Sequence, residues 1–206
     1  MKNRFKGEKI RQSVANEAAR ILAETGDNDY ARARRKAAEH IRCKGRDELP
    51  DNAEIALALK DYLQLYAGDQ RKGQLADLRR TAINAMETFK EFRPRLTGAV
   101  LDGTASNNSP IQLYLHADYP EQLSMVLMDK RIPWEEEDRN LRFSDGSERR
   151  YPLFRFYAGD HAVEMICLSN HGLRSPPLNF IDNRPDKGAS LEQLRKLLED
   201  TEVNGK

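Results

Sequence analysis

The sequence predicts an α+β (α/β) fold, in which a small mixed sheet with packed helices follows an all-helical N-terminal segment. In the first third of the chain, apolar residues recur at steps of three and four, which is typical of amphipathic helices. In the second half, short alternating or continuously apolar runs are bounded by turn residues, which is typical of strands. The 206 residues suffice for one domain of ordinary size and an appendage.

The N-terminal segment is expected to form three helices, over residues 8–25, 30–43 and 52–66. Pro50 lies near the start of the third helix, where proline is favourable. A glycine-containing stretch at 67–73 interrupts the helical pattern and is the expected boundary. The expected parts are a helical domain at 1–70, an α/β domain at 74–169, and an irregular wrapping segment with a C-terminal helix at 170–206.

In the α/β domain, strands are expected at 95–101, 111–117, 151–158 and 161–168, with a hairpin turn at 144–147. The expected helices are 74–92, 120–131 and 191–199. The first of these ends before Pro94, because the residue that precedes a proline disfavours the helical conformation. The acidic run Glu135–Asp138 is expected to form a solvated turn.

Charge and composition restrict the classes of function. The formal net charge is +1, so the chain as a whole is not a polyanion binder. Residues 1–50 nevertheless carry 13 lysines and arginines against 8 acidic residues, which permits contact with nucleic acid. In that reading Arg32, Arg34 and Arg35 contact phosphates; in the alternative they are the solvated face of a small helical cap.

The cysteines and the absence of long apolar runs favour a cytoplasmic protein. Cys43 and Cys167 have no cysteine or histidine at metal-ligand spacing, and no disulfide framework is indicated. The charged start of the sequence does not match a secretory signal. No run of 18 apolar residues occurs, so no membrane partner is expected.

The stretch Gly98–Leu115, GAVLDGTASNNSPIQLYL, resembles the signature GSxxxG…SDIDL of the nucleotidyltransferase superfamily. Gly98 and Gly103 match the two glycines, and Thr104 begins the small pair that follows. Ser109 and the run Ile111–Leu113 continue the match without a gap. The whole chain also resembles a family of uncharacterised bacterial proteins of similar length, with an eroded signature after a helical N-terminal segment.

Three departures fall on the residues that carry the reaction. Ala99 replaces the serine of the signature, and Pro110 and Gln112 replace its two aspartates. In that family the aspartates bind two divalent ions, which neutralise the triphosphate and activate the attacking hydroxyl. Proline offers no ligand, and a glutamine oxygen is a poorer Mg²⁺ ligand than a carboxylate. No cofactor is therefore expected, and Mg²⁺ only if the site is still active.

The resemblance implies a set of site residues. Nucleotidyltransferases place a third carboxylate on a late strand, which implies Glu164 as the retained acidic, catalytic residue. Otherwise Glu164 is an outward-facing polar residue of a half-exposed strand. The expected nucleotide- or phosphate-binding residues are Gly98, Gly103, Thr104, Ser106, Ser109 and Gln112. In a rearranged metal site, Asp102 and Asp118 would join Glu164.

A second polar run lies on one face of the expected strand 111–117, through Gln112, Tyr114 and His116. It predicts either a small polar groove that binds a base or a peptide, or the solvent face of an edge strand.

Three functions follow as hypotheses. The first is a nucleotidyltransferase-fold protein with an eroded two-metal site that acts as a binding or regulatory module for a nucleotide or a protein partner. The second is an active nucleotidyltransferase with a rearranged carboxylate site. The third is a nucleic-acid-binding regulator that uses the basic N-terminal helices.

Overall fold

The computed structural model describes residues 2–25, 29–43, 45–66, 69–106, 108–170 and 174–203. It confirms the α+β class: helices accompany a five-stranded mixed sheet, and the N-terminal part is helical. The chain divides into two compact units, Met1–Gly68 and Asp69–Lys206. The described residues of 170–206, expected as a separate segment, belong to the second unit.

The first unit consists of α1 (Lys2–Thr25), α2 (Tyr30–Ile41), the short 3₁₀ helix η1 (Arg46–Glu48) and α3 (Asn52–Tyr66). Asp29 caps α2, because its side chain accepts a hydrogen bond from the backbone N–H of Arg32 at 2.9 Å. Arg11 forms an ion pair with Glu54, 2.6 Å between Nη2 and Oε2, and thereby joins α1 to α3. The buried apolar side chains of the unit include Val14, Ala18, Leu22, Tyr30, Ala33, Ile55 and Leu59.

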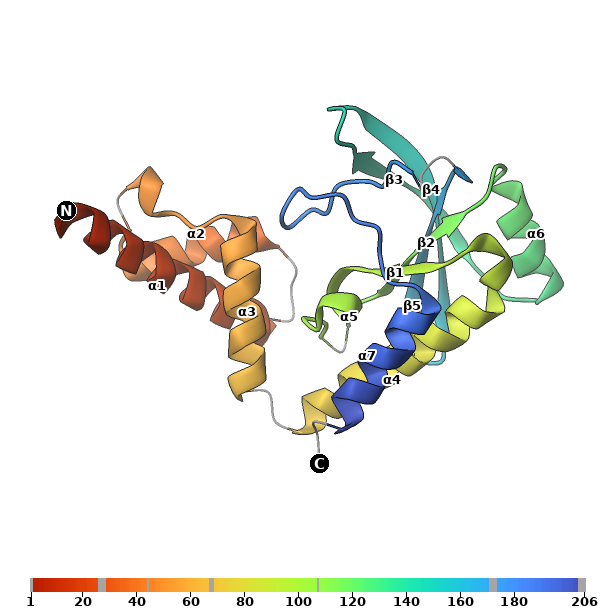
Figure 1. The fold of residues 1–206 in the computed structure, drawn as a ribbon, viewed down its shortest axis with the longest axis horizontal. Coiled ribbons are helices and arrows are strands. Elements are labelled where there is room, and N and C mark those ends of the chain that lie inside the picture. The colour runs from red at the N-terminus through yellow and green to blue at the C-terminus, as the bar shows by residue number, and fades with distance from the viewer. Residues whose placement is uncertain are drawn as a thin grey trace. The chain divides into compact units, whose positions relative to one another are not determined.

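The second unit carries the sheet (Figure 1). Its elements are α4 (Asp69–Thr88), η2 (Lys90–Phe92), β1 (Arg95–Thr97), α5 (Gly98–Asp102), β2 (Ile111–His116), α6 (Glu121–Asp129), β3 (Glu135–Arg142), β4 (Glu148–Ala158), β5 (His161–Leu168) and α7 (Leu191–Val203). The strand order is β1-β2-β5-β4-β3. Only β2 and β5 run parallel; the other neighbouring pairs are antiparallel.

One face of this sheet supports the main core. Side chains from α4, α6 and α7 pack against alternate residues of the strands, so all three helices cover the same face. Strand residues alternate between the two faces, which places residues 112, 114, 116 and 164 on the other one. That second face holds a smaller apolar cluster of Tyr114, Leu153, Ile166 and Leu168.

The irregular segment before α7 is bonded to the sheet. Ala189 and Leu96 exchange two backbone hydrogen bonds, and Leu178 donates to the carbonyl of Arg142 at 2.7 Å. The Asp186 carboxylate accepts hydrogen bonds from the hydroxyls of Thr97 and Tyr114. These contacts hold the segment against β1, β2 and the end of β3.

Three local expectations were wrong. The strand expected at 95–101 ends at Thr97, because Gly98 has φ of +70° and starts the short helix α5. The acidic run Glu135–Asp138 is part of β3 rather than a turn: its backbone pairs with β4, and its exposed carboxylates include partners of arginines on β4. Helix α4 begins at Asp69, inside the break expected at 67–73. No helix among the described residues is long and apolar enough to cross a membrane.

Candidate functional site

The centre of the candidate site is the pair Gln112 and Glu164. They occupy matching positions on the parallel strands β2 and β5, and the Gln112 amide donates to Glu164 Oε2 at 3.0 Å. Glu164 lies at the position that the resemblance implies for a third carboxylate, beside the residue that replaces an aspartate. The structure therefore brings these two predicted site residues together.

Glu164 is buried, with only 4% of the residue exposed, so its interpretation as an outward-facing residue of a half-exposed strand was wrong. Two arginines neutralise its carboxylate. Arg155, on β4, approaches Oε1 with Nη2 at 2.8 Å and Nε at 3.3 Å. Arg139, on β3, approaches Oε2 at 3.4 Å. Hydrogen bonding to Glu164 raises the pKa of the Arg155 guanidinium.

These contacts leave the carboxylate poorly suited to a metal ion. Both oxygens already accept hydrogen bonds, and a divalent cation beside Arg139 and Arg155 would meet two positive charges. Mg²⁺ needs several oxygen ligands in near-octahedral arrangement. The described residues contain no group of three or more His, Cys, Asp or Glu that could hold a metal ion.

Gly98 lies directly against this pair. A Cβ atom at Gly98 would come within 2.3 Å of Gln112 Oε1, and the φ of +70° disfavours any side chain. The backbone conformation therefore favours glycine here, and a side chain at this position would displace the Gln112 amide. This close contact joins the start of α5 to β2.

In the loop after α5, several of the groups expected to bind a phosphate form hydrogen bonds within the protein instead. The backbone N–H groups of Gly103 and Thr104 both donate to the carbonyl of Ala99. Ser106 and Ser109 bond to each other, through the Ser106 N–H to Ser109 Oγ at 2.9 Å and the Ser109 N–H to the Ser106 carbonyl at 3.0 Å. The N–H groups of Gly103, Thr104, Ser106 and Ser109 are therefore already bonded within α5 and the loop and do not point to an anion.

Two arginines of α4 bond to α5 and to the loop that follows it. Arg71 donates to the carbonyls of Thr104 and Ala105, and Arg79 donates to those of Val100 and Leu101. Cations are favourable at carbonyl groups of this kind, at the C-terminal end of a helix. Burial lowers the pKa of both guanidinium groups. These contacts stabilise α5 and the loop after it, and no sequence pattern predicted them.

The carboxylates proposed for a rearranged metal site are not assembled around Glu164. Asp118 follows β2 at its carboxyl end, whereas Gln112 and Glu164 pair near its start, six positions earlier. At a rise of about 3.3 Å per residue, that separation is roughly 20 Å along the strand. Asp102 is the last residue of α5.

Comparison with family models, with curated proteins and with solved structures finds no match to this chain. The resemblance to nucleotidyltransferases therefore depends on the sequence motif alone.

The basic N-terminal residues lie in the first unit. Arg34 is half-buried and donates to the carbonyl of Pro50 and to Asn52 Oδ1, both at 3.3 Å. It therefore links α2 to the start of α3. Arg32 and Arg35 are exposed. The contacts of Arg34 are those of a structural residue, as in the alternative of a small helical cap.

The polar run on β2 is not the solvent face of an edge strand, because β2 lies between β1 and β5. Tyr114 and His116 are buried. Burial, followed by the charge of Asp186, raises the pKa of the Tyr114 hydroxyl. Asp186, Arg139 and Arg155 complete the polar contacts of this face, and no sequence pattern predicted them as site residues. In the sequence these three are charged residues in polar stretches, and many other residues of the chain fit the same description.

Proposed function

We propose that the unit Asp69–Lys206 is a nucleotidyltransferase-type domain that has lost its two-metal chemistry and acts as a binding module. One observation carries the proposal: Gln112 and Glu164 pair side by side on parallel strands, beside Gly98. The signature assigns the position of Gln112 to a metal-binding aspartate and that of Gly98 to its first glycine, and the resemblance implies Glu164 as the third carboxylate.

The residue types support the loss of transfer chemistry. Pro110 and Gln112 cannot supply the negative charge that two divalent ions need, and Glu164 is already bonded to two guanidinium groups. A hydrogen-bonded network of this kind orders the site without a metal ion. The domain therefore keeps a shaped polar site in place of a reaction centre.

Arg139 is the part of the site that remains accessible to a ligand. Its side chain is 41% exposed, and among the described residues its guanidinium forms one ion pair, with Glu164 at 3.4 Å. Arg155 is more occupied, because it also bonds to Glu137 at 3.1 Å. A guanidinium with unused donors suits a phosphate group. The proposed ligand is accordingly a nucleotide, bound through its phosphates without a need for Mg²⁺.

Restoring the signature tests the ancestry of the site. The double variant Pro110→Asp and Gln112→Asp is expected to bind Mn²⁺ on the order of tenfold or more tighter than the unmodified chain. Electron paramagnetic resonance of free Mn²⁺ measures this directly. Asp160, in the exposed turn between β4 and β5, provides a mutation control as Asp160→Asn. No gain in Mn²⁺ affinity by the double variant would contradict the proposed ancestry.

Nucleotide binding and turnover are tested separately. Thermal unfolding with ATP, GTP, CTP or UTP is expected to shift upward equally with and without Mg²⁺, since ligand at a hundredfold excess over its Kd stabilises by about 2.7 kcal/mol. Arg139→Gln should reduce the shift, and Arg150→Gln, which alters an exposed ion pair with Asp138, should not. Labelled product that disappears in Glu164→Ala would instead establish an active transferase. If none of the four nucleotides raises the unfolding temperature, the proposal of a nucleotide ligand is wrong.

A further inference from the structure

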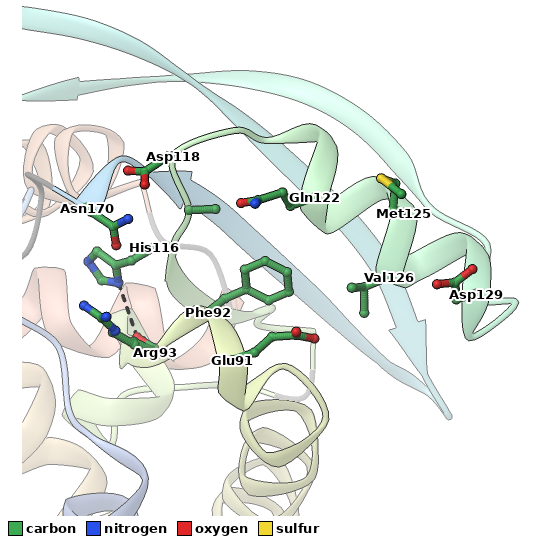
Figure 2. Close-up of a pocket in the computed structure, with 11 residues that line it drawn as sticks. Glu91, Phe92, Arg93, His116, Asp118, Gln122, Met125, Val126, Asp129 and Asn170 are labelled. Atoms are coloured by element: carbon green, nitrogen blue, oxygen red, sulfur yellow. Dashed lines mark hydrogen bonds between the residues drawn. The ribbon is translucent and has the colours of Figure 1, made fainter.

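A pocket of about 570 Å³ lies at the opposite end of β2 from Gln112 (Figure 2). It is formed where β2 and β5 end, between α6 and η2. The carboxyl ends of parallel strands are a common place for ligand sites in α/β sheets, and this volume suits a small molecule. The lining residues are Glu91, Phe92, Arg93, His116, Ala117, Asp118, Gln122, Met125, Val126, Asp129 and Asn170.

His116 is the buried polar residue of this pocket, with 6% exposed. Its Nδ1 lies 3.3 Å from the carbonyl oxygen of Arg93. A carbonyl can only accept, so Nδ1 carries the proton of the neutral ring and Nε2 is left as a hydrogen-bond acceptor. Among the described residues, the His116 side chain makes no other hydrogen bond. Its second nitrogen is thus available to a donor in the pocket.

The histidine adds no positive charge to the pocket at neutral pH. Burial lowers the pKa of its imidazole below the ordinary value of 6.5, and the charges of Arg95 and Arg93 lower it further. The groups that face it from the neighbouring elements include Arg93 before β1 and Asp118 and Asn170 after the two strands. The ring is therefore neutral and offers a lone pair.

The formal charges of the lining are mainly negative. Glu91, Asp118 and Asp129 contribute three carboxylates against the one guanidinium of Arg93. Within the described part of the chain, none of these three carboxylates has a hydrogen bond or an ion pair. Gln122 and Asn170 each add a side-chain amide, which can both donate and accept. The formal charge of the lining therefore favours a positively charged ligand.

The remaining surface of the pocket is apolar. Figure 2 shows Asp118, Asn170 and His116 on one side and Met125, Val126 and Asp129, from α6, on the other. The ring of Phe92 lies between the two groups. An apolar body can contact Phe92 and Val126 while its polar ends reach the carboxylates on either side.

We propose that this pocket binds a small organic cation: a molecule with an apolar or aromatic body and one or two ammonium groups. Asp118 binds one ammonium group, His116 Nε2 accepts a hydrogen bond from the same end, and Phe92 and Val126 contact the body. Asp129 and Glu91 attract a second positive group. This site shares no residue with the network around Glu164, so it does not depend on the proposed nucleotide site.

A matched set of three probes tests the charge preference in the full-length protein. The probes are p-xylylenediamine, its neutral analogue 1,4-benzenedimethanol and its anionic analogue terephthalate. The diamine is expected to bind at least about tenfold tighter than the diol, since only the diamine pairs with the carboxylates. Binding of the diamine should weaken from about 20 mM to about 500 mM salt, because partly exposed charges are screened.

Variants locate the binding. Asp118→Asn is expected to weaken diamine binding about three- to tenfold, the effect of removing one partly exposed ion pair. Asp160→Asn removes the same charge from an exposed turn and should leave binding unchanged, as should Arg139→Gln at the other site. The ring signals of His116 in a proton NMR titration should shift with the diamine, which reports occupancy of this pocket independently of affinity.

Three results would overturn the proposal. Equal binding of diamine and diol would show that charge is irrelevant, and tighter binding of terephthalate would show an anion site at Arg93. Absence of diamine binding, or binding that Asp118→Asn leaves unchanged while the His116 signals do not move, would remove the cation site altogether.

Discussion

Gln112 and Glu164 are 52 residues apart in the sequence, yet they stand opposite each other on parallel strands, with 3.0 Å between the amide nitrogen and the carboxylate. The pair connects β2 to β5, which run parallel, whereas the other neighbouring strands of the described sheet are antiparallel. Through Arg155 it extends to β4, and through Arg139 to β3. One buried carboxylate thus joins side chains from four of the five strands.

The first prediction concerns Glu164→Gln. Loss of the charge leaves Arg139 and Arg155 without their shared counter-ion. Removing one partner of a buried pair is strongly destabilising, but these guanidinium groups are partly exposed and can be rehydrated. The free energy of unfolding is therefore expected to fall by about 1–3 kcal/mol.

Urea unfolding followed by the fluorescence of Trp134 measures this effect, because Trp134 is the single tryptophan and packs against the core of the second unit. Glu192→Gln, on the exposed surface of α7, is the control and should stay within about 0.5 kcal/mol. A cost for Glu164→Gln no greater than for this control would show that the network contributes little stability.

The second prediction compares two glycines with similar backbones. Gly98 has φ of +70° and Gly146 has φ of +79°, but a Cβ atom meets Gln112 only at Gly98 and nothing within 4 Å at Gly146. Gly146→Ala is expected to cost about 1–2 kcal/mol from the left-handed conformation alone. Gly98→Ala is expected to cost about 1–3 kcal/mol more, because the methyl group displaces Gln112.

A double variant separates the two contributions at Gly98. In Gly98→Ala with Gln112→Ala, the clash is gone, and the combined loss of unfolding free energy should be smaller than the sum of the single losses. The same urea titration measures all four proteins. Additive losses would show that Gln112 does not press against Gly98.

The third prediction concerns Asp186, whose carboxylate accepts from Thr97, Tyr114 and the backbone N–H of Gly188. Asp186→Ala removes the shared acceptor of these donors and loosens the segment before α7, whereas Tyr114 and Thr97 keep a hydrogen bond to each other. The unfolding free energy is expected to fall by about 1–3 kcal/mol, because buried donors lose an acceptor. Hydrogen exchange at Ala189, whose N–H bonds to Leu96, should accelerate in this variant. Asp160→Ala is the control, and unchanged exchange would contradict the anchoring role.

The fourth prediction concerns pH. Burial holds the pKa of His116 below its ordinary value of 6.5. In the unfolded chain the imidazole therefore takes up a proton near pH 6.5, whereas in the native protein the imidazole is still neutral at that pH. The stability that the neutral His116 contributes should be complete above pH 6.5. It should decrease as the pH falls from 6.5 toward the pKa of His116 in the native protein.

His116→Gln removes this contribution, whereas other titrating groups affect both proteins alike. The difference in unfolding free energy between the two proteins is therefore expected to change between about pH 7.5 and pH 5.5. A constant difference across that range would show that burial does not keep the imidazole neutral.

Local sequence determined most of the elements. The helix expected at 52–66 and the strand at 161–168 have those bounds, because their apolar spacing is a property of neighbouring residues. The strand expected through residue 101 failed at Gly98, where one left-handed residue redirects the chain into a helix. The acidic start of β3 was also missed, since its exposed charges are compatible with a strand only when the partner strand supplies arginines.

The sequence alone also marked Glu164, because a single charge in an apolar strand is conspicuous. The hydrogen-bond and ion-pair partners of Glu164 depend on the tertiary structure alone. The pairing of β2 with β5 and the positions of Arg139 and Arg155 depend on how distant strands pack, which no local pattern specifies. The same holds for His116, whose burial and pocket arise where the ends of two parallel strands meet α6. Periodicity determines the elements, whereas contacts between residues far apart in the chain determine the chemical environment of each side chain.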